Sequence, residues 1–228
     1  MQAIIEKTPE LARIIADLTG DGHLQYDGKR GVIFFYSKNF NVIKSFNQRF
    51  RSVFNVSGKI RKVKNTGKAF TLRYQISFSS KNIAKILYCF GTPAGNKTNN
   101  LFSIPSWIFY GDKKMKKQYL RGIYATEGSV YATKIKNGFR WRIELEQYKN
   151  EKIKNERQKF MIQIKQLLEE FGVQCSPVRY GKKQKRKDGS FTIAMKLDIE
   201  KSSFRKFNEQ IGFDDKLKTE KLLSAIAG

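Results

Sequence analysis

The sequence is poor in the residues that build metal clusters and covalent cross-links. It holds two cysteines and one histidine, His23. A single histidine excludes His-rich metal sites and most catalytic triads that use this residue. Cys89 and Cys175 lie far apart, each in or beside an apolar segment. This placement indicates reduced structural thiols rather than a redox or metal site.

Acidic residues and long apolar runs are scarce as well. The 228-residue chain has 20 Asp and Glu against 45 Lys and Arg, giving a formal net charge of +25 that is spread along its length. Such a charge opposes compaction unless a polyanion is bound, so nucleic acid is the expected partner and an anionic membrane surface the competing one. No apolar run approaches the ~20 residues that cross a bilayer.

The N-terminal stretch "MQAIIEKTPELARII" carries acids where a signal peptide would be basic and then apolar. We therefore expect a soluble intracellular protein that does not enter a membrane. It would be cytoplasmic in a prokaryote and organellar in a eukaryote.

The pattern of the more abundant residues predicts two similar halves. The chain is 40% hydrophobic, with 18 Phe and 10 Tyr, which is enough for a packed core. Helical stripes and hairpin turns recur twice in the same order. The first half is expected to hold helix, hairpin, helix, hairpin and helix at 8–20, 22–37, 39–54, 58–78 and 80–91. The second repeats this order at 112–126, 128–148, 151–171, 174–199 and 201–211, before a last helix at 216–227.

The segment "TPAGNKTNN" between the halves has the composition of a linker. The predicted domains are therefore residues 1–91 and 112–228, joined by 92–111.

Polar and apolar residues alternate along the expected strands, as in "RWRIELEQ", "FTLRYQISF" and "FTIAMKLDI". The alternation predicts an α+β fold in which each half has an antiparallel sheet. One face of each sheet is apolar and lies under helices, and the other is polar and faces solvent; we call the latter the wet face. Long donors on the wet faces and at the hairpin tips "KVKNTGK" and "GKKQKRKDGS" suit base edges and phosphates. The predicted DNA-binding residues are Lys59, Arg61, Arg73, Gln75, Arg140, Arg142, Arg179, Lys182, Lys183, Lys185 and Lys196.

Two stretches, "IIADLTGDGHL" and "LRGIYATEGSV", each end an apolar helix in a carboxylate followed by glycine. The carboxylates are Asp21 and Glu127. Small residues spaced four apart would let the two helices pack closely and deliver both acids to the same end of a pseudo-twofold pair. These small residues are Ala16 and Gly20 in the first helix and Gly122 and Thr126 in the second.

An acid at a helix C-terminus is electrostatically unfavourable, so its occurrence in both copies indicates a role beyond ending a helix. Two neighbouring carboxylates repel each other unless they share a cation. Mg²⁺, or another hard divalent cation such as Mn²⁺, accepts carboxylate oxygens and keeps positions for phosphate oxygens. Because such ions activate water and stabilise the charge of phosphodiester cleavage, the sequence predicts a metal-dependent nuclease.

Both stretches resemble the LAGLIDADG motif of homing endonucleases, in the monomeric form that has two motifs in one chain. The fitting residues are Ile14, Ala16, Leu18, Gly20, Asp21 and Gly22 in one copy and Leu120, Gly122, Ile123, Tyr124, Glu127 and Gly128 in the other. The departures are Asp17, at a normally apolar position, and Arg121, Thr19 and Thr126. We expect them to affect helix packing more than chemistry. The order of elements resembles this family over nearly the whole chain.

The resemblance implies two pseudo-twofold-related αββαββα repeats whose antiparallel sheets form a saddle along the DNA major groove, with helices on the outer face. Asp21 and Glu127 would coordinate divalent metals, aided by the carbonyls of Gly20 and Thr126. Each acid would serve one DNA strand, so the product would be a double-strand break with short 3′ overhangs.

Members of the family also keep a Lys or Gln beside the metals. Lys38, at the end of the second expected strand, fits that place in the first half. In the second half the counterpart is Gln147 or Lys149.

Two other functions use the same fold. An RNA-splicing maturase would bind intron RNA, and a non-catalytic DNA-binding protein would need no acids. Because both acids are present, we favour a monomeric, intron-encoded endonuclease. An intein origin is disfavoured because the chain starts with Met and lacks the terminal His-Asn and Cys or Ser of protein splicing.

Overall fold

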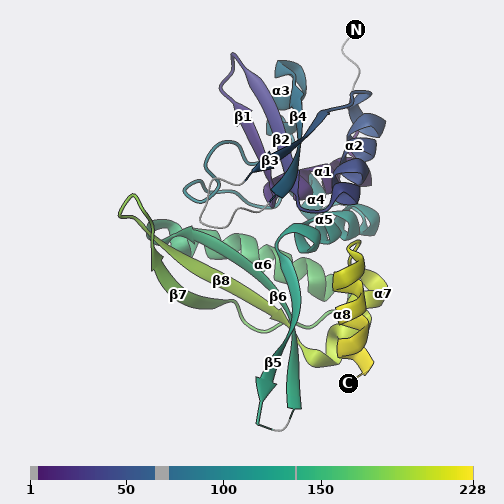
Figure 1. The fold of residues 1–228 in the computed structure, drawn as a ribbon, viewed down its shortest axis with the longest axis vertical. Helices are drawn as coiled ribbons and strands as arrows, with labels where there is room; N and C mark the ends of the chain where they lie inside the picture. The colour runs from purple at the N-terminus through teal and green to yellow at the C-terminus, as the bar shows by residue number, and fades with distance from the viewer. Residues whose placement is uncertain (1–4, 65–71, 137, 228) are drawn as a thin grey trace.

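The computed structural model describes residues 5–64, 72–136 and 138–227. They form two similar halves, each a helix-backed antiparallel sheet (Figure 1). The turn "NTGK" and Asn137 of the turn "KNG" lie outside the described residues. The first half consists of α1 (Pro9–Thr19), β1 (Gly22–Tyr26), β2 (Gly31–Ser37), α2 (Phe40–Phe54), β3 (Lys59–Lys64), β4 (Leu72–Ser79) and α3 (Lys81–Cys89).

The second half repeats the order of the first. A short helix, α4 (Ser106–Phe109), lies in the segment that joins them. The repeat consists of α5 (Lys113–Thr126), β5 (Gly128–Ile135), β6 (Gly138–Asn150), α6 (Lys154–Glu170), β7 (Arg179–Lys185), β8 (Phe191–Ile199) and α7 (Phe204–Gln210). The last helix is α8 (Lys216–Ala227). The predicted α+β fold of two αββαββα repeats is confirmed.

The one large difference in boundaries is the start of β7. The sequence predicts a strand from 174, but β7 begins at Arg179. Pro177 has no amide hydrogen to give to a ladder, and the preceding segment makes a single isolated bridge from Cys175 to Ile199.

The two sheets have the same topology. Their strand orders are β1-β2-β4-β3 and β5-β6-β8-β7, and every neighbouring pair is antiparallel. Each sheet therefore places the first strand after its motif helix at one edge. Because a repeated order of elements gives a repeated sheet, the two halves are structural duplicates.

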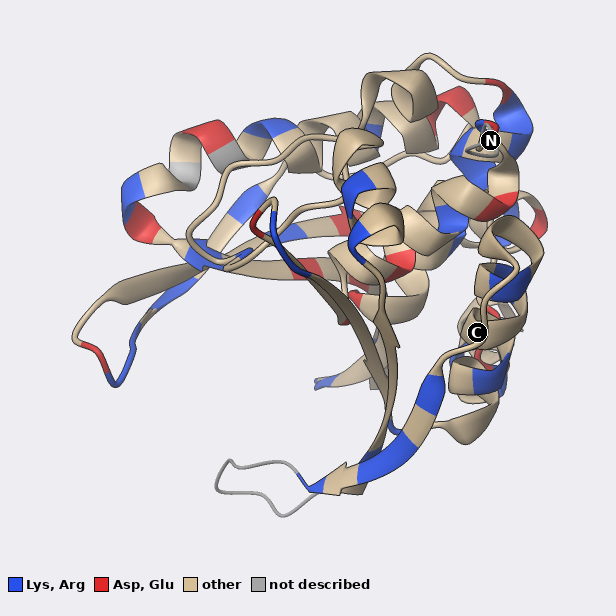
Figure 2. Cartoon of the chain, turned by 90° about the horizontal axis from the view of Figure 1, so that it is seen from above, with Lys and Arg blue, Asp and Glu red and all other residues tan. Residues whose placement is uncertain are grey.

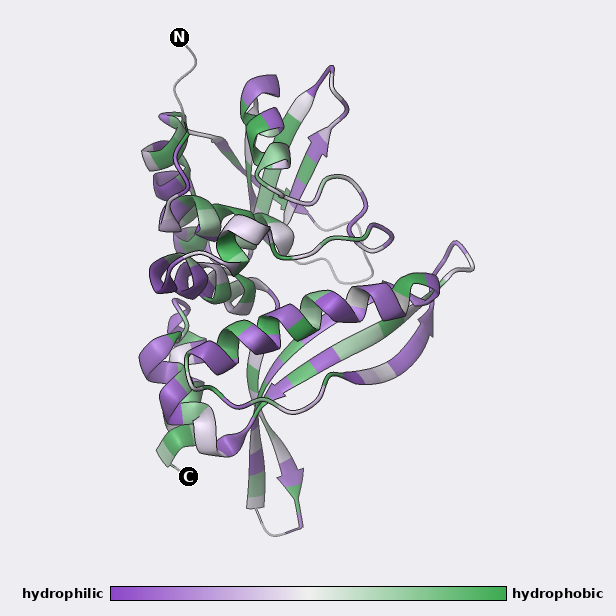
Figure 3. Ribbon diagram, turned by 180° about the vertical axis from the view of Figure 1, so that it is seen from behind, coloured by the Kyte–Doolittle hydropathy of each residue, from purple (hydrophilic) through white to green (hydrophobic). Residues whose placement is uncertain are grey.

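Helices cover one face of each sheet, and the core lies between them. Ile33, Phe35 and Ile76 of the first sheet are buried, and Phe46 of α2 stacks on Phe35 with 4.3 Å between ring centroids. On the second sheet α6 runs along the back of the strands, with green and purple alternating along it (Figure 3). The opposite faces are left to solvent.

Helices α1 and α5 pack against each other between the two halves. Every residue of α1 from Leu11 to Thr19 is buried, because this helix is covered on one side by its own sheet and α2 and on the other by α5. Within the described part of the chain, every helix is too short or too polar to cross a membrane. Both cysteines are free thiols; Cys175 is buried, whereas Cys89 is exposed.

Candidate active site between the two halves

The two motif helices begin with ordinary caps. The Thr8 side chain accepts a hydrogen bond from the Leu11 amide at 3.2 Å, and Asp112 accepts one from Met115 at 2.8 Å. Such caps satisfy amides that have no partner inside the helix. Both helices therefore start at fixed points and end in the acidic motifs.

The close approach of α1 and α5 depends on the small residues. A Cβ atom built on Gly122 would lie 2.5 Å from the Cβ of Ala16, and one on Gly20 would overlap the side chain of Thr126. Each motif position thus meets its own counterpart, as expected for helices related by a pseudo-twofold axis. The predicted contact between the small-residue faces is confirmed by this packing.

Asp21 and Glu127 follow these helices directly and share one electrostatic environment. Asp21 is exposed and Glu127 half-buried. Although the Asp21 side chain reaches solvent, the surrounding protein desolvates both carboxyl groups and raises the pKa of each; for Glu127 the negative charge of Asp21 adds to this and raises the pKa to about 7. Nearby Lys97 and Lys218 act in the opposite direction on both acids.

Lys97 closes the end of α1. Its Nζ donates to the carbonyl oxygens of Leu18 at 3.0 Å, Thr19 at 2.9 Å, Gly20 at 2.5 Å and Gly22 at 2.7 Å. Burial lowers the pKa of Lys97 to about 8, although the charges of Glu127 and Asp21 favour its protonated form.

Lys218 of α8 plays the same part at the end of α5. Its Nζ donates to the carbonyl oxygens of Tyr124 at 3.2 Å and Ala125 at 2.6 Å. Neither motif helix has a basic residue in its own last turn. The open C-terminal carbonyls and the negative end of the dipole therefore take a cation from elsewhere in the chain. Sequence reasoning missed both lysines; the lack of a basic residue in either last turn indicated that a cation was needed there, but not which one.

The three side chains that were predicted to lie beside the metals differ in location and in solvent exposure. Lys38 is exposed and lines, with Asp21, a cavity of about 650 Å³. Gln147 and Lys149 are buried on the helix-covered side of β6. The Nζ of Lys149 donates to the Lys97 carbonyl at 3.1 Å, and its charge acts on Glu127. Their roles stay predictions.

The predicted metal ligands fit a hard cation in kind. They are the carboxylates of Asp21 and Glu127 and the carbonyls of Gly20 and Thr126, of which the Gly20 carbonyl already accepts a hydrogen bond from the Lys97 ammonium group. The hydroxyl of Thr126 is engaged with the Gly122 carbonyl at 3.0 Å. Among the described residues no group of three or more His, Cys, Asp or Glu is placed so that it could hold a metal ion. A metal here would rely on the acid pair, carbonyls, water and phosphate oxygens.

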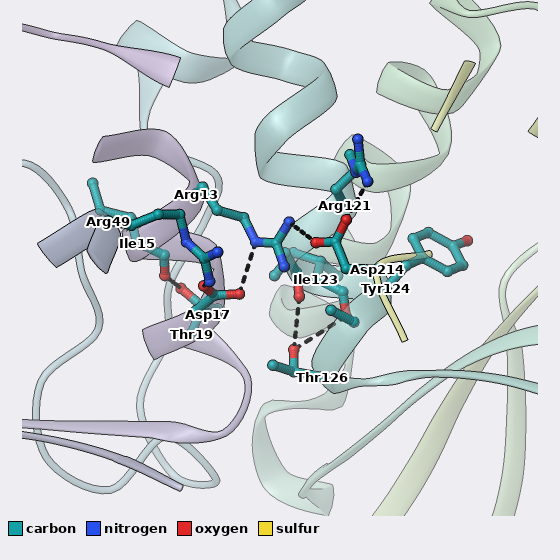
Figure 4. Close-up of polar contacts among 12 residues, drawn as sticks. Arg13, Ile15, Asp17, Thr19, Arg49, Arg121, Ile123, Tyr124, Thr126 and Asp214 are labelled. Atoms are coloured by element: carbon teal, nitrogen blue, oxygen red, sulfur yellow. Dashed lines mark hydrogen bonds and ion pairs between the residues drawn. The ribbon is translucent and has the colours of Figure 1, made fainter. Parts of the chain in front are cut away.

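Asp17 does more than affect the packing of the helix. It is 1% exposed and receives hydrogen bonds from Arg13 at 2.9 Å and Arg49 at 2.8 Å. Arg13 also reaches Asp214 of the second half at 2.6 Å, and Arg121 of α5 bonds the same carboxylate (Figure 4). The unusual acid in the first motif and the Arg121 departure therefore belong to an ion-pair network that ties the two halves together.

The wet face of the first sheet carries cations and no acid among its described residues. Opposed residues of an antiparallel ladder share a face, and Lys59 and Arg61 lie opposite Ser77 and Gln75. Figure 2 shows Lys and Arg along β3, up to the segment drawn in grey. Arg73 lies on the same face, 4.3 Å from the ring centroid of Tyr36. These four donors therefore lie on one face of the sheet, and their contact with DNA stays a prediction.

The second sheet differs in two respects. Arg140, Arg142, Arg179 and Lys196 share its wet face, but that face also carries acids. A register shift between Tyr180 and Lys183 then inserts an extra residue into β7.

The shift changes where the basic tip points. Lys183 and Lys185 lie opposite Ile193 and Phe191, on the face that α6 covers further along the sheet. Lys183 pairs there with Glu151 at 2.5 Å. Lys182 falls within the irregularity itself. Lys183 and Lys185 therefore lie on the opposite face of the sheet from Arg179, and DNA binding by the tip lysines stays a prediction.

Comparison with known proteins agrees with this architecture. Residues 114–212 match the profile of the LAGLIDADG-like domain. The tRNA-splicing ligase RtcB of Pyrococcus furiosus is 27% identical over 228 residues, which are 96% of this chain and 23% of that protein. The glutamine–fructose-6-phosphate aminotransferase of Methanocaldococcus jannaschii is 31% identical over 220 residues, 94% of this chain and 17% of that protein. The chain spans less than a quarter of the length of these relatives.

Two solved structures share the fold over nearly the whole chain. The homing endonuclease I-WcaI, bound to its DNA recognition sequence, has a TM-score of 0.59 at 15% identity, covering 94% of this chain and 85% of that one. Full-length DUF199/WhiA from Thermatoga maritima has a TM-score of 0.51 at 13% identity, covering 97% and 62%. Residues 114–212 thus form a LAGLIDADG-like domain, and the chain as a whole shares the duplicated fold of these two structures.

Proposed function

We propose that the protein is a site-specific DNA endonuclease that makes a metal-dependent double-strand break in a long duplex target. The observation that carries the proposal is the packing of α1 on α5, which brings Asp21 and Glu127 into one electrostatic environment. Fold alone does not decide activity. The pair of acids at the junction of two basic sheets is what favours cleavage.

The acid pair supports metal binding because its charge lacks full compensation within the chain. The raised pKa of Glu127, about 7, means that a negative charge is costly at this desolvated position beside Asp21. A divalent cation removes that cost. When bound, such a cation would activate water and stabilise charge on the phosphodiester oxygens. Mg²⁺ or Mn²⁺ is the class of ion that suits these oxygen ligands.

The chain's own residues would orient the reacting groups. Asp21 and Glu127 would each serve one DNA strand. Lys97 and Lys218 hold the ends of the motif helices in place and present positive charge towards both acids. Lys38 lies at the edge of the same cavity as Asp21, where an exposed ammonium group suits a phosphate oxygen.

The relatives favour the origin of this segment as a mobile genetic element. One is a ligase and the other an aminotransferase, yet each matches this chain over nearly its full length. A segment shared by otherwise different proteins favours a unit that spreads independently of them, as homing does. Because both matched segments are parts of longer proteins, the intron-encoded origin stays a prediction.

A second candidate is a DNA-binding protein that does not cleave. The likeness to DUF199/WhiA and the position of Lys97 favour it, since the Lys97 ammonium already occupies the Gly20 carbonyl that a metal would use. The I-WcaI likeness, to a protein bound to its DNA recognition sequence, suits both candidates. No feature of the described residues singles out RNA, so the maturase alternative stays a prediction.

The test is cleavage of a plasmid library whose inserts are random over about two helical turns. Wild-type protein with Mg²⁺ should linearise a subset of sequences, and chelation should stop this. Asp21→Asn and Glu127→Gln should abolish double-strand cleavage, whereas Glu209→Gln, an exposed acid far from the motifs in sequence, should not. Sequence-specific binding without scission in any sample would instead support the second candidate.

A further inference from the structure

The wet face of the second sheet carries a lattice of alternating charges that the first sheet lacks. Arg142, Glu144 and Glu146 come from β6, Lys196 and Asp198 from β8, and Arg179 from β7. We call these six residues the charge lattice. It lies where a saddle-shaped DNA-binding protein would contact base edges.

The acids of the lattice come at an energetic cost. Glu144 lies directly opposite Asp198, and like charges in that position destabilise a ladder. The cations compensate: Lys196 Nζ is 3.0 Å from carboxylate oxygens of both Glu144 and Glu146. Although burial works against it, these bonds raise the pKa of Lys196. A face selected only for attraction to phosphate would carry the cations without the acids.

Asp198 holds two arginines at once. Its Oδ2 accepts from Arg142 Nη1 at 3.3 Å and also from Arg179 Nη2. The two side chains remain 28% and 46% exposed, and each guanidinium has five N–H donors, so donors are left for another partner. The second oxygen of Asp198, Oδ1, is buried and has no hydrogen-bond partner among the described residues.

Such an arrangement suits base recognition. Arginine reads guanine through a bidentate contact to O6 and N7, which needs a fixed, planar fork. A carboxylate that accepts a hydrogen bond from one N–H of the guanidinium restricts the orientation of that group before DNA binds. This restriction lowers the conformational entropy that the arginine side chain loses on binding. The same carboxylate repels phosphate, so it reduces binding to unrelated sequences.

We propose that Asp198 is a positioning residue that aims Arg142 and Arg179 at guanines in the half-site under the second sheet. The first sheet, with Lys59 and Arg61 exposed and no acid among its described wet-face residues, supplies attraction to phosphate instead. The inference rests on sequence-specific DNA binding within the proposed function, but it does not depend on cleavage.

The experiment selects bound duplexes from a pool randomised over about two helical turns, with EDTA present so that no strand is cut. Wild type should enrich guanines at two positions of one half-site. Asp198→Asn should lose about tenfold of the discrimination at those positions, while its affinity for random duplex stays equal or rises. Asp198→Glu should restore part of the preference. Arg142→Ala should remove the preference at only one position.

A matched change on the first sheet separates the two roles. Arg61→Gln should weaken binding to all sequences and reduce the salt slope by about 1, with the selected guanines unchanged. Circular dichroism and thermal unfolding confirm that each variant is folded.

Three results would overturn the inference. The first is an Asp198→Asn selection profile identical to wild type. The second is a uniform loss of affinity across all sequences, which marks a structural role for Asp198. The third is failure of the wild type to enrich any sequence, which overturns the proposed function as well. Specific binding without cleavage in Mg²⁺ would refute only the endonuclease proposal.

Discussion

Removing the charge of Glu127 should stabilise the metal-free protein. The pKa of this carboxyl rises from 4.5 to about 7 on folding, so between these values the folded state binds the proton more tightly than the unfolded state. Stability therefore falls as pH rises through this window and stays low above it. At 1.36 kcal/mol per pKa unit the full effect is about 3 kcal/mol. Because water reaches this half-buried side chain, we expect about 1–3 kcal/mol.

The assay is urea unfolding of wild type and Glu127→Gln in EDTA at several pH values. The variant, which mimics the neutral carboxyl group, should be more stable above pH ~7, and the difference should disappear towards pH ~4.5. Mg²⁺ should then stabilise the wild type more than the variant, because the cation needs the charge. Glu209→Gln, at an exposed position, should show neither behaviour.

A wild type that is more stable than Glu127→Gln at pH ~8 without metal would refute this reasoning. It would mean that Lys97 and its neighbouring lysines compensate the carboxylate fully. The proposed need for a metal at this position would then lose its physical basis.

Three further predictions concern packing and charge around the acids. Gly122→Ala should cost about 1–3 kcal/mol in unfolding free energy, because its Cβ would lie 2.5 Å from that of Ala16. Adding Ala16→Gly should recover much of this loss, and no recovery would argue against the contact. Asp17→Ala should cost about 3–5 kcal/mol, because it leaves buried Arg13 with one carboxylate fewer; urea unfolding that shows a cost below about 1 kcal/mol would contradict the network. Lys97→Met should abolish Mg²⁺-dependent scission while gel-shift affinity for DNA is retained, and undiminished scission would remove Lys97 from the site.

Local patterns were sufficient to predict most of the fold. The spacing of the small residues predicts which faces of α1 and α5 can approach each other closely. The alternation of polar and apolar residues along β4, β6 and β8 predicts which strand faces are buried. These are short-range regularities with periods of 3.6 and 2. The paired acids follow from the same reasoning because each ends its own helix.

Contacts between distant segments were not predictable in the same way. Lys97 reaches carbonyl groups 75 to 79 positions earlier in the chain, and nothing in "TPAGNKTNN" marks it as more than part of a linker. Asp17 lies four residues after Arg13 on α1, so spacing alone allows that pair. Its contact with Arg49 and the link onward from Arg13 to Asp214 form only after folding, and spacing identifies neither of them.

The basic tip shows a third kind of limit. One extra residue in β7 reverses which face Lys183 and Lys185 occupy, since a slip of one residue exchanges the two faces of a strand. A bulge of this kind leaves no mark on a run of consecutive basic residues. The sequence therefore could not show that Lys183 and Lys185 lie on the opposite face of the sheet from Arg179.

The most direct test of the central claim is the location of the metal. Crystals of the protein with a selected DNA duplex and Mn²⁺ should show anomalous scattering at the ends of α1 and α5. We predict peaks within about 2.0–2.4 Å of carboxylate oxygens of both Asp21 and Glu127, next to a backbone phosphate of the duplex. Bound DNA with no anomalous peak there, and with Lys97 still on the Gly20 carbonyl, would contradict the account.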